Sequence, residues 1–142
     1  MTNNRTLDEF LSAETARGWE PALAAVVRGL AQQCADLSGH VSRASALGIS
    51  GDAGSANVQG ETQKKLDVLA NDLLLSFAAG CAHVAGIVSE ELDEARWFER
   101  AQKAPYLLVA DPLDGSSNVD ANVSVGTIFS VLPFIGVGER PG

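Results

Sequence analysis

Apolar residues recur at helical spacing in the first half of the chain. Thr6 and Glu9 have the spacing of a capping box, which predicts a short helix over residues 6–17. Pro21 suits a first helical position. A long amphipathic helix ending near Gly48 is then predicted by an apolar series at three- and four-residue intervals: Leu23, Val26, Val27, Leu30, Cys34, Leu37 and Val41.

A glycine-rich stretch separates this helix from the next one. Residues 48–60 read GISGDAGSANVQG, which indicates a loop. Such a loop is either a plain connector or, because an acidic helix follows it, a gate. The following helix is expected over residues 61–79, with Asp67 beside a buried stripe of Leu66, Leu69, Leu73 and Phe77.

The pattern changes to short apolar runs in the second half of the chain. Val84–Val88 and Tyr106–Ala110 read as strands, and the second run ends abruptly at Asp111. Residues 94–101 are expected to form a polar helix, and Thr127–Ile135 a further strand. Helices followed by strands predict an α+β or layered α/β fold, with N-terminal helices followed by a mixed sheet.

Composition narrows the function classes. The 142 residues are 46% hydrophobic and carry 10 Lys and Arg against 18 Asp and Glu, a net charge of −8. This charge argues against nucleic acid and anionic membrane surfaces as partners. Two isolated cysteines and an N-terminus without an apolar signal segment lead us to expect a cytoplasmic protein.

Two acidic features stand where the predicted strands end. One is Glu90-Glu91, and the other is the segment from Asp111 to Asn118, DPLDGSSN. Carboxylate oxygens, joined by the carbonyl of Leu113, suit Mg²⁺ or Mn²⁺. The consecutive N–H groups of Gly115, Ser116 and Ser117 suit a phosphate if a helix begins there. Together these features indicate a metal-bridged phosphate ester as ligand.

Each feature taken alone also has a plain structural interpretation. DPLDG is a good surface turn, because Asp, Pro and Gly are turn residues for local reasons. Glu90-Glu91 and Asp67 are equally typical of solvated carboxylates. The combination changes these odds because it is part of a longer resemblance to a known family.

Three segments carry a longer resemblance: VQGETQKKLDVLANDLLL (58–75), GIVSEELDE (86–94) and YLLVADPLDGSSNVDANVSVGTIFSV (106–131). In order and spacing they resemble class I fructose-1,6-bisphosphatase, of the Mg²⁺-dependent, lithium-sensitive phosphatase superfamily. The continuation DGSSNVD resembles the sugar bisphosphatase branch rather than the inositol monophosphatases, which usually continue DGT-x-N-F. The resemblance implies the sugar phosphatase fold, in its inositol monophosphatase-like N-terminal half.

The resemblance implies a role for each matching residue. Glu90, Asp111 and Asp114 match metal ligands, and Leu113 matches a ligand that acts through its carbonyl. Asp67, Glu91 and Glu61 match acidic positions assigned to catalysis, with Asp67 helping to activate the attacking water. The segment that holds the sugar 1-phosphate is matched by Asp114, Gly115, Ser116 and Ser117.

The implied reaction is Mg²⁺-dependent hydrolysis of fructose 1,6-bisphosphate to fructose 6-phosphate, in gluconeogenesis or carbon fixation, by a homotetramer. The family's chain is more than twice as long, so residues 1–142 are expected to be the N-terminal part of a sugar bisphosphatase domain, without its C-terminal half. An uncovered sheet edge and apolar face are expected to make such a chain marginally folded or self-associating, and weakly active. An inositol-phosphate-type phosphatase and a non-catalytic fragment are the alternatives.

Overall fold

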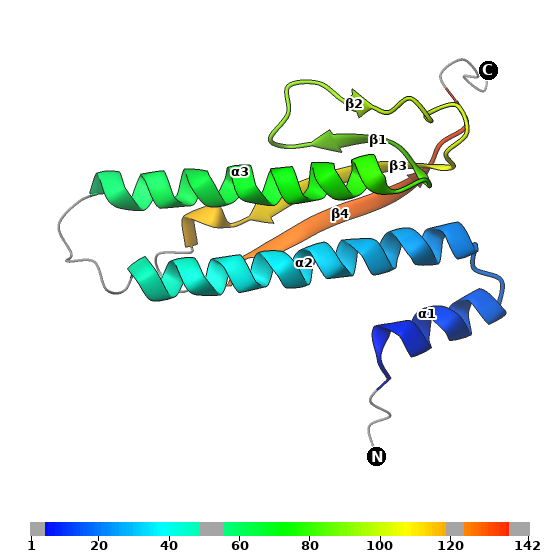
Figure 1. The fold of residues 1–142 in the computed structure, drawn as a ribbon, viewed down its shortest axis with the longest axis horizontal. Coiled ribbons are helices and arrows are strands. Elements are labelled where there is room, and N and C mark those ends of the chain that lie inside the picture. The colour runs from blue at the N-terminus through cyan, green and yellow to red at the C-terminus, as the bar shows by residue number, and fades with distance from the viewer. Residues whose placement is uncertain (1–4, 49–55, 119–123, 137–142) are drawn as a thin grey trace.

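Three helices form the first half of the chain (Figure 1). The computed structural model describes residues 5–48, 56–118 and 124–136, and it describes side chains outside 44–48 and 56–64. Helix α1 is Leu7–Ala16, α2 is Pro21–Gly48 and α3 is Ala56–Gly80. None of the helices in these ranges is long and apolar enough to cross a membrane.

The start of α1 confirms the predicted capping box. The Glu9 amide donates to Thr6 Oγ1 at 3.2 Å, and the Thr6 amide donates to Glu9 Oε2 at 2.9 Å. The two bonds satisfy amides that have no partner within the helix. The predictions that α2 begins at Pro21 and ends near Gly48 are also confirmed.

Helix α3 begins earlier than predicted. Residues 56–60, expected to belong to the loop, are helical. A single glycine inside a helix costs only about 1 kcal/mol, so Gly60 does not stop α3. The remainder of the predicted loop, and with it the gating hypothesis, falls on residues 49–55, outside the described ranges.

The apolar stripe of α3 is also shifted from the prediction. Leu66 is buried as expected, but Leu69, Leu73 and Phe77 are only half-buried. The centre of the stripe is a series at four-residue spacing, Leu66, Ala70, Leu74 and Ala78. The reason is that α3 packs against both α2 and the sheet, so its apolar surface is wide. Gly29 of α2 permits the close approach, because a Cβ there would lie 2.0 Å from the Phe77 ring.

The strands form one mixed sheet in the order β2-β1-β3-β4. The strands are β1 (Val84–Ser89), β2 (Arg96–Trp97), β3 (Tyr106–Asp114) and β4 (Gly126–Pro133). Strands β1 and β3 are parallel, and the other two pairs are antiparallel. Helices α2 and α3 lie side by side over one face of the sheet (Figure 1), which confirms the layered α+β prediction.

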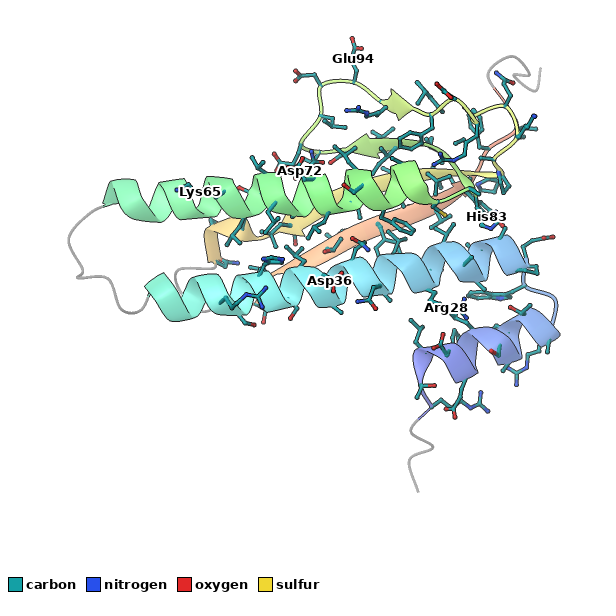
Figure 2. All side chains as sticks on the ribbon, in the orientation of Figure 1. Arg28, Asp36, Lys65, Asp72, His83 and Glu94 are labelled. Carbon is teal, nitrogen blue, oxygen red and sulfur yellow. The ribbon has the colours of Figure 1, made fainter. Side chains whose placement is uncertain are left out.

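Two local predictions in this half were wrong. Residues 94–101 contain the short strand β2 instead of a helix, because Arg96 and Trp97 pair with Ile87 and Gly86. Glu94 lies on the connection before β2 and points away from the long helices (Figure 2). Strand β3 does not end at Asp111 but continues to Asp114, paired with β4 through a register shift.

One face of the sheet is covered by helices, whereas apolar side chains on the other face are partly exposed to solvent. Leu108, Ala110 and Ile87 are buried beneath α2 and α3, in one cluster with Val26 and Leu30. Side chains alternate between the faces of a strand. On the opposite face, Val88, Leu132 and Ile128 are 36%, 44% and 57% exposed. The core therefore lies between the helices and the sheet.

Candidate active site

Parallel pairing of β1 and β3 brings two predicted site residues together. Ser89 lies opposite Ala110, and the Glu90 amide donates to the Ala110 carbonyl at 3.0 Å. Glu90 and Asp111 directly follow this last pair of the β1–β3 ladder, so they are neighbours. The two carboxylates are close enough for the charge of Asp111 to be the largest influence on the pKa of Glu90.

Like charges dominate this edge of the sheet. The negative charge of Asp111 raises the pKa of Glu90 above its usual value, as does a hydrogen bond that the protonated Glu90 carboxyl donates to Asp111; desolvation, Glu91 and Asp114 raise it further. The ion pairs within the described ranges, Arg17–Glu14 and Arg28–Asp8, do not involve these carboxylates. The group is therefore stabilised by binding a proton or a cation.

The DPLDG segment is held by its apolar residues. Pro112 and Leu113 are buried, and Leu113 packs with Leu37 and Leu66 between α2 and α3. Asp111 Oδ1 accepts a hydrogen bond from the Leu113 amide at 3.1 Å. Thr127 Oγ1 of β4 donates to the Pro112 carbonyl at 3.0 Å. The DPLDG segment, which taken alone is typical of a surface turn, is in its first four residues a distorted strand end.

The chain turns one residue later, at Gly115. Its φ of +76° is a conformation that side chains disfavour. Ser116–Asn118 then form a single 3₁₀ turn, closed by a 2.8 Å hydrogen bond from the Asn118 amide to the Gly115 carbonyl. Ser117 is exposed, Ser116 is half-buried, and α3 contacts this turn. The sequence suggests a phosphate site here if a helix begins at this point. The structure has only this short 3₁₀ turn.

Of the three carboxylates predicted to act in catalysis, the two whose side chains the structure describes influence the pKa of Glu90 less than Asp111 does. Asp67 is half-buried on α3 and is not among the charges that raise the pKa of Glu90. Glu91 is exposed, and its amide donates to Ser89 Oγ at 3.3 Å. Glu61 lies in α3, but its side chain is outside the described part of the chain.

The donor chemistry of this edge fits a hard divalent cation, since it offers carboxylate and carbonyl oxygens. The crowded pair of Glu90 and Asp111 is the arrangement that a cation relieves. Within residues 5–48, 56–118 and 124–136, however, no group of three or more His, Cys, Asp or Glu side chains is arranged to hold a metal ion. A metal ion here is therefore part of the proposal below.

Three polar residues of this region received no role from the sequence. Asn71 and Ser89 form a buried hydrogen-bonded pair behind Glu90, and Thr127 holds the Pro112 carbonyl. The available signal was a polar residue inside an apolar pattern: Asn71 interrupts the stripe of α3, and Ser89 ends an apolar strand. Their partners became apparent only with the packing of α3 on β1.

A mixed sheet covered by helices, with carboxylates at the ends of neighbouring parallel strands, defines a layered α/β protein with an acidic site at the strand ends. The chain belongs to the fructose-1,6-bisphosphatase family. The family model described as "Fructose-1-6-bisphosphatase, N-terminal domain" matches residues 5–140. The predicted family resemblance is thereby confirmed.

Named relatives agree with this assignment. The chain is 48% identical over 132 residues to a class 1 fructose-1,6-bisphosphatase of Acinetobacter baumannii. It is 45% identical over 131 residues to the one from Acinetobacter baylyi. Each alignment covers 92% of this chain and 40% of the relative, so the chain spans about 40% of the length of these curated relatives.

Solved structures show the same fold. The fructose-1,6-bisphosphatase of Leishmania major matches with a TM-score of 0.69 and 27% identity in its holo form. The apo form gives a TM-score of 0.71 and 26% identity. Each match covers 91% of this chain, and 38% and 36% of the respective solved chains.

Proposed function

We propose that this protein is a Mg²⁺-dependent phosphatase that hydrolyses the 1-phosphate of fructose 1,6-bisphosphate. Residues 1–142 would be the N-terminal part of its sugar bisphosphatase domain. The observation that carries the proposal is the neighbouring pair of Glu90 and Asp111, just beyond the last parallel pair of β1 and β3, in a chain of this family. The curated relatives are named "Fructose-1,6-bisphosphatase class 1", which supports fructose 1,6-bisphosphate as the substrate.

In the proposed site, different residues would bind the metal ion and the phosphate group. Glu90, Asp111, Asp114 and the Leu113 carbonyl would hold Mg²⁺, or Mn²⁺ in its place. A cation held there would stabilise the charge on the phosphoryl group and on the leaving oxygen. Gly115, Ser116 and Ser117, with Asp114, would hold the 1-phosphate through backbone amides and hydroxyls.

The reaction transfers the phosphoryl group to water. Asp67 or Glu91 accepts the proton of the attacking water, with Glu61 as a further acidic group nearby in the family pattern. A bond forms between the water oxygen and phosphorus, and the bond from phosphorus to the C1 oxygen breaks. The sugar oxygen takes up a proton, which gives fructose 6-phosphate and phosphate.

The experiment is phosphate release from fructose 1,6-bisphosphate with and without Mg²⁺, with inositol 1-phosphate in parallel. Asp111→Asn is expected to abolish release, while Asp72→Asn, an exposed carboxylate on α3 (Figure 2), is the matched control. Release from inositol 1-phosphate alone would overturn the choice of substrate. Because the chain spans only part of the length of its relatives, its activity is expected to be weak, so Mn²⁺ binding is measured by titration as well. Loss of binding in Asp111→Asn but not in Asp72→Asn supports the proposed metal site.

The proposal also implies a cellular location, a pathway and an assembly state. The protein would act in the cytoplasm, in gluconeogenesis or carbon fixation, as a homo-oligomer. Sedimentation at several concentrations tests the assembly.

A further inference from the structure

A buried polar pair connects α3 to the acidic edge of the sheet. Ser89 and Asn71 are only 3% and 9% exposed. Ser89 Oγ donates a hydrogen bond to Asn71 Oδ1 at 2.8 Å. Ser89 is the last residue of β1, and Asn71 lies one helical turn after Asp67.

The same hydroxyl also reaches the turn that carries the acidic residues. Ser89 Oγ accepts a hydrogen bond from the Glu91 amide at 3.3 Å. The serine therefore uses its hydroxyl as a donor toward the helix and as an acceptor toward the turn. On the other side, the Glu90 amide donates to the Ala110 carbonyl of β3. The Glu90-Glu91 backbone is thus fixed from α3 and from β3.

Stability alone does not require a polar pair at this place. Buried residues next to the pair are apolar: Ala70 precedes Asn71 in α3, and Ala110 lies opposite Ser89 in the sheet. Replacing both members of a buried hydrogen-bonded pair by apolar groups of similar shape is nearly neutral. The feature that distinguishes the pair is its position: Ser89 directly precedes Glu90, and Ala110, which lies opposite Ser89, directly precedes Asp111. Two like charges therefore lie side by side just beyond the pair.

We propose that Asn71 and Ser89 are positioning residues, which hold the Glu90-Glu91 turn so that the carboxylate of Glu90 stays against Asp111. Without the tether, mutual repulsion separates the carboxylates, and a cation must first bring them back together. The role of the tether in cation binding rests on the proposed function. Its role in fixing the turn does not.

The test compares Mn²⁺ affinity, measured by titration of the whole chain, across four variants. Ser89→Ala removes the tether, and Asn71→Leu with Ser89→Ala removes it without leaving an unpaired buried group. Both are expected to weaken Mn²⁺ binding by about 10–100-fold, the usual effect of losing a group that orients a metal ligand. Ser89→Thr keeps the hydroxyl and should retain most of the affinity. Ser42→Ala removes a hydrogen-bonded hydroxyl elsewhere, on α2, and should leave the affinity unchanged.

Hydrogen exchange supplies the second readout. In Ser89→Ala the Glu91 amide is expected to exchange faster, by more than the change seen at core amides of β3. Unchanged Mn²⁺ affinity in the double variant, with binding by the wild type, would overturn the positioning role. If the wild type binds no Mn²⁺, the proposed function fails, and the exchange of Glu91 alone decides whether the pair fixes the turn.

Discussion

The two halves of β3 have opposite effects on the stability of the fold. Tyr106–Ala110 pair regularly with β4 and, apart from one register shift between Val84 and Gly86, with β1, and every second side chain is buried beneath the helices. Asp111–Asp114 carry acidic groups, and their register with β4 shifts. The first half supplies burial, which stabilises the fold, whereas the second half concentrates like charges, which destabilises it. The acidic half keeps its shape because Pro112 and Leu113 remain buried between its carboxylates.

The largest effect on stability is expected from the apolar half. Leu108 is fully buried, so Leu108→Ala should lower the free energy of unfolding by about 2–5 kcal/mol. Ile128→Ala, on the exposed face of the same sheet, should cost under about 1 kcal/mol, because Ile128 is already 57% exposed. Urea unfolding followed by circular dichroism measures both. Equal losses would show that the two faces do not differ as described.

A smaller loss is expected where the acidic half ends. Gly115→Ala places a side chain at a φ of +76°, with its Cβ 3.2 Å from Asn118 Nδ2, and should cost about 1–2 kcal/mol. Gly80→Ala at the end of α3 is the control, because nothing lies within 4 Å of a Cβ there. Urea unfolding of the two variants gives the difference. A stabilising Gly115→Ala would exclude conformational strain at this turn.

The acidic half should also make stability depend on pH. The pKa of Glu90 is raised in the folded state, chiefly by Asp111, so the folded protein holds this proton more tightly than the unfolded chain. The contribution is fully present below the unfolded pKa and is lost as pH rises through the folded pKa. Glu90→Gln should therefore flatten the fall in unfolding free energy above pH 4.5, and Glu94→Gln should not. Added Mg²⁺ is expected to oppose the fall in the wild type and in Glu94→Gln, but not in Glu90→Gln. Identical pH profiles for both variants would contradict this account.

Substitutions on the exposed face of the sheet are expected to have the smallest effect on folding stability. They should, however, measurably change the self-association of the chain. Val88, Ile128 and Leu132 leave apolar surface in contact with water, which favours self-association of this chain. Ile128→Lys should reduce a concentration-dependent rise in mass in sedimentation experiments, with little change in unfolding. A compact monomer at all concentrations in the wild type would refute this expectation.

Local chemistry made much of the fold predictable. The capping box at Thr6, the start of α2 at Pro21 and the apolar strand from Tyr106 are each read from neighbouring residues. The prediction for residues 94–101 was wrong because β2 is only two residues long and exists through its pairing with β1. The stripe of α3 was misplaced because two different surfaces pack against that helix.

The sequence by itself determined which residues are available for chemistry: an acidic pair after one apolar run, and DPLDG after another. The tertiary structure alone decided that Glu90 meets Asp111, since this requires the parallel pairing of β1 with β3. It also decided that Asn71 and Ser89 face each other, through the packing of α3 on the sheet. Patterns along the chain record spacing within one element, whereas these contacts depend on the register between elements that are distant in sequence.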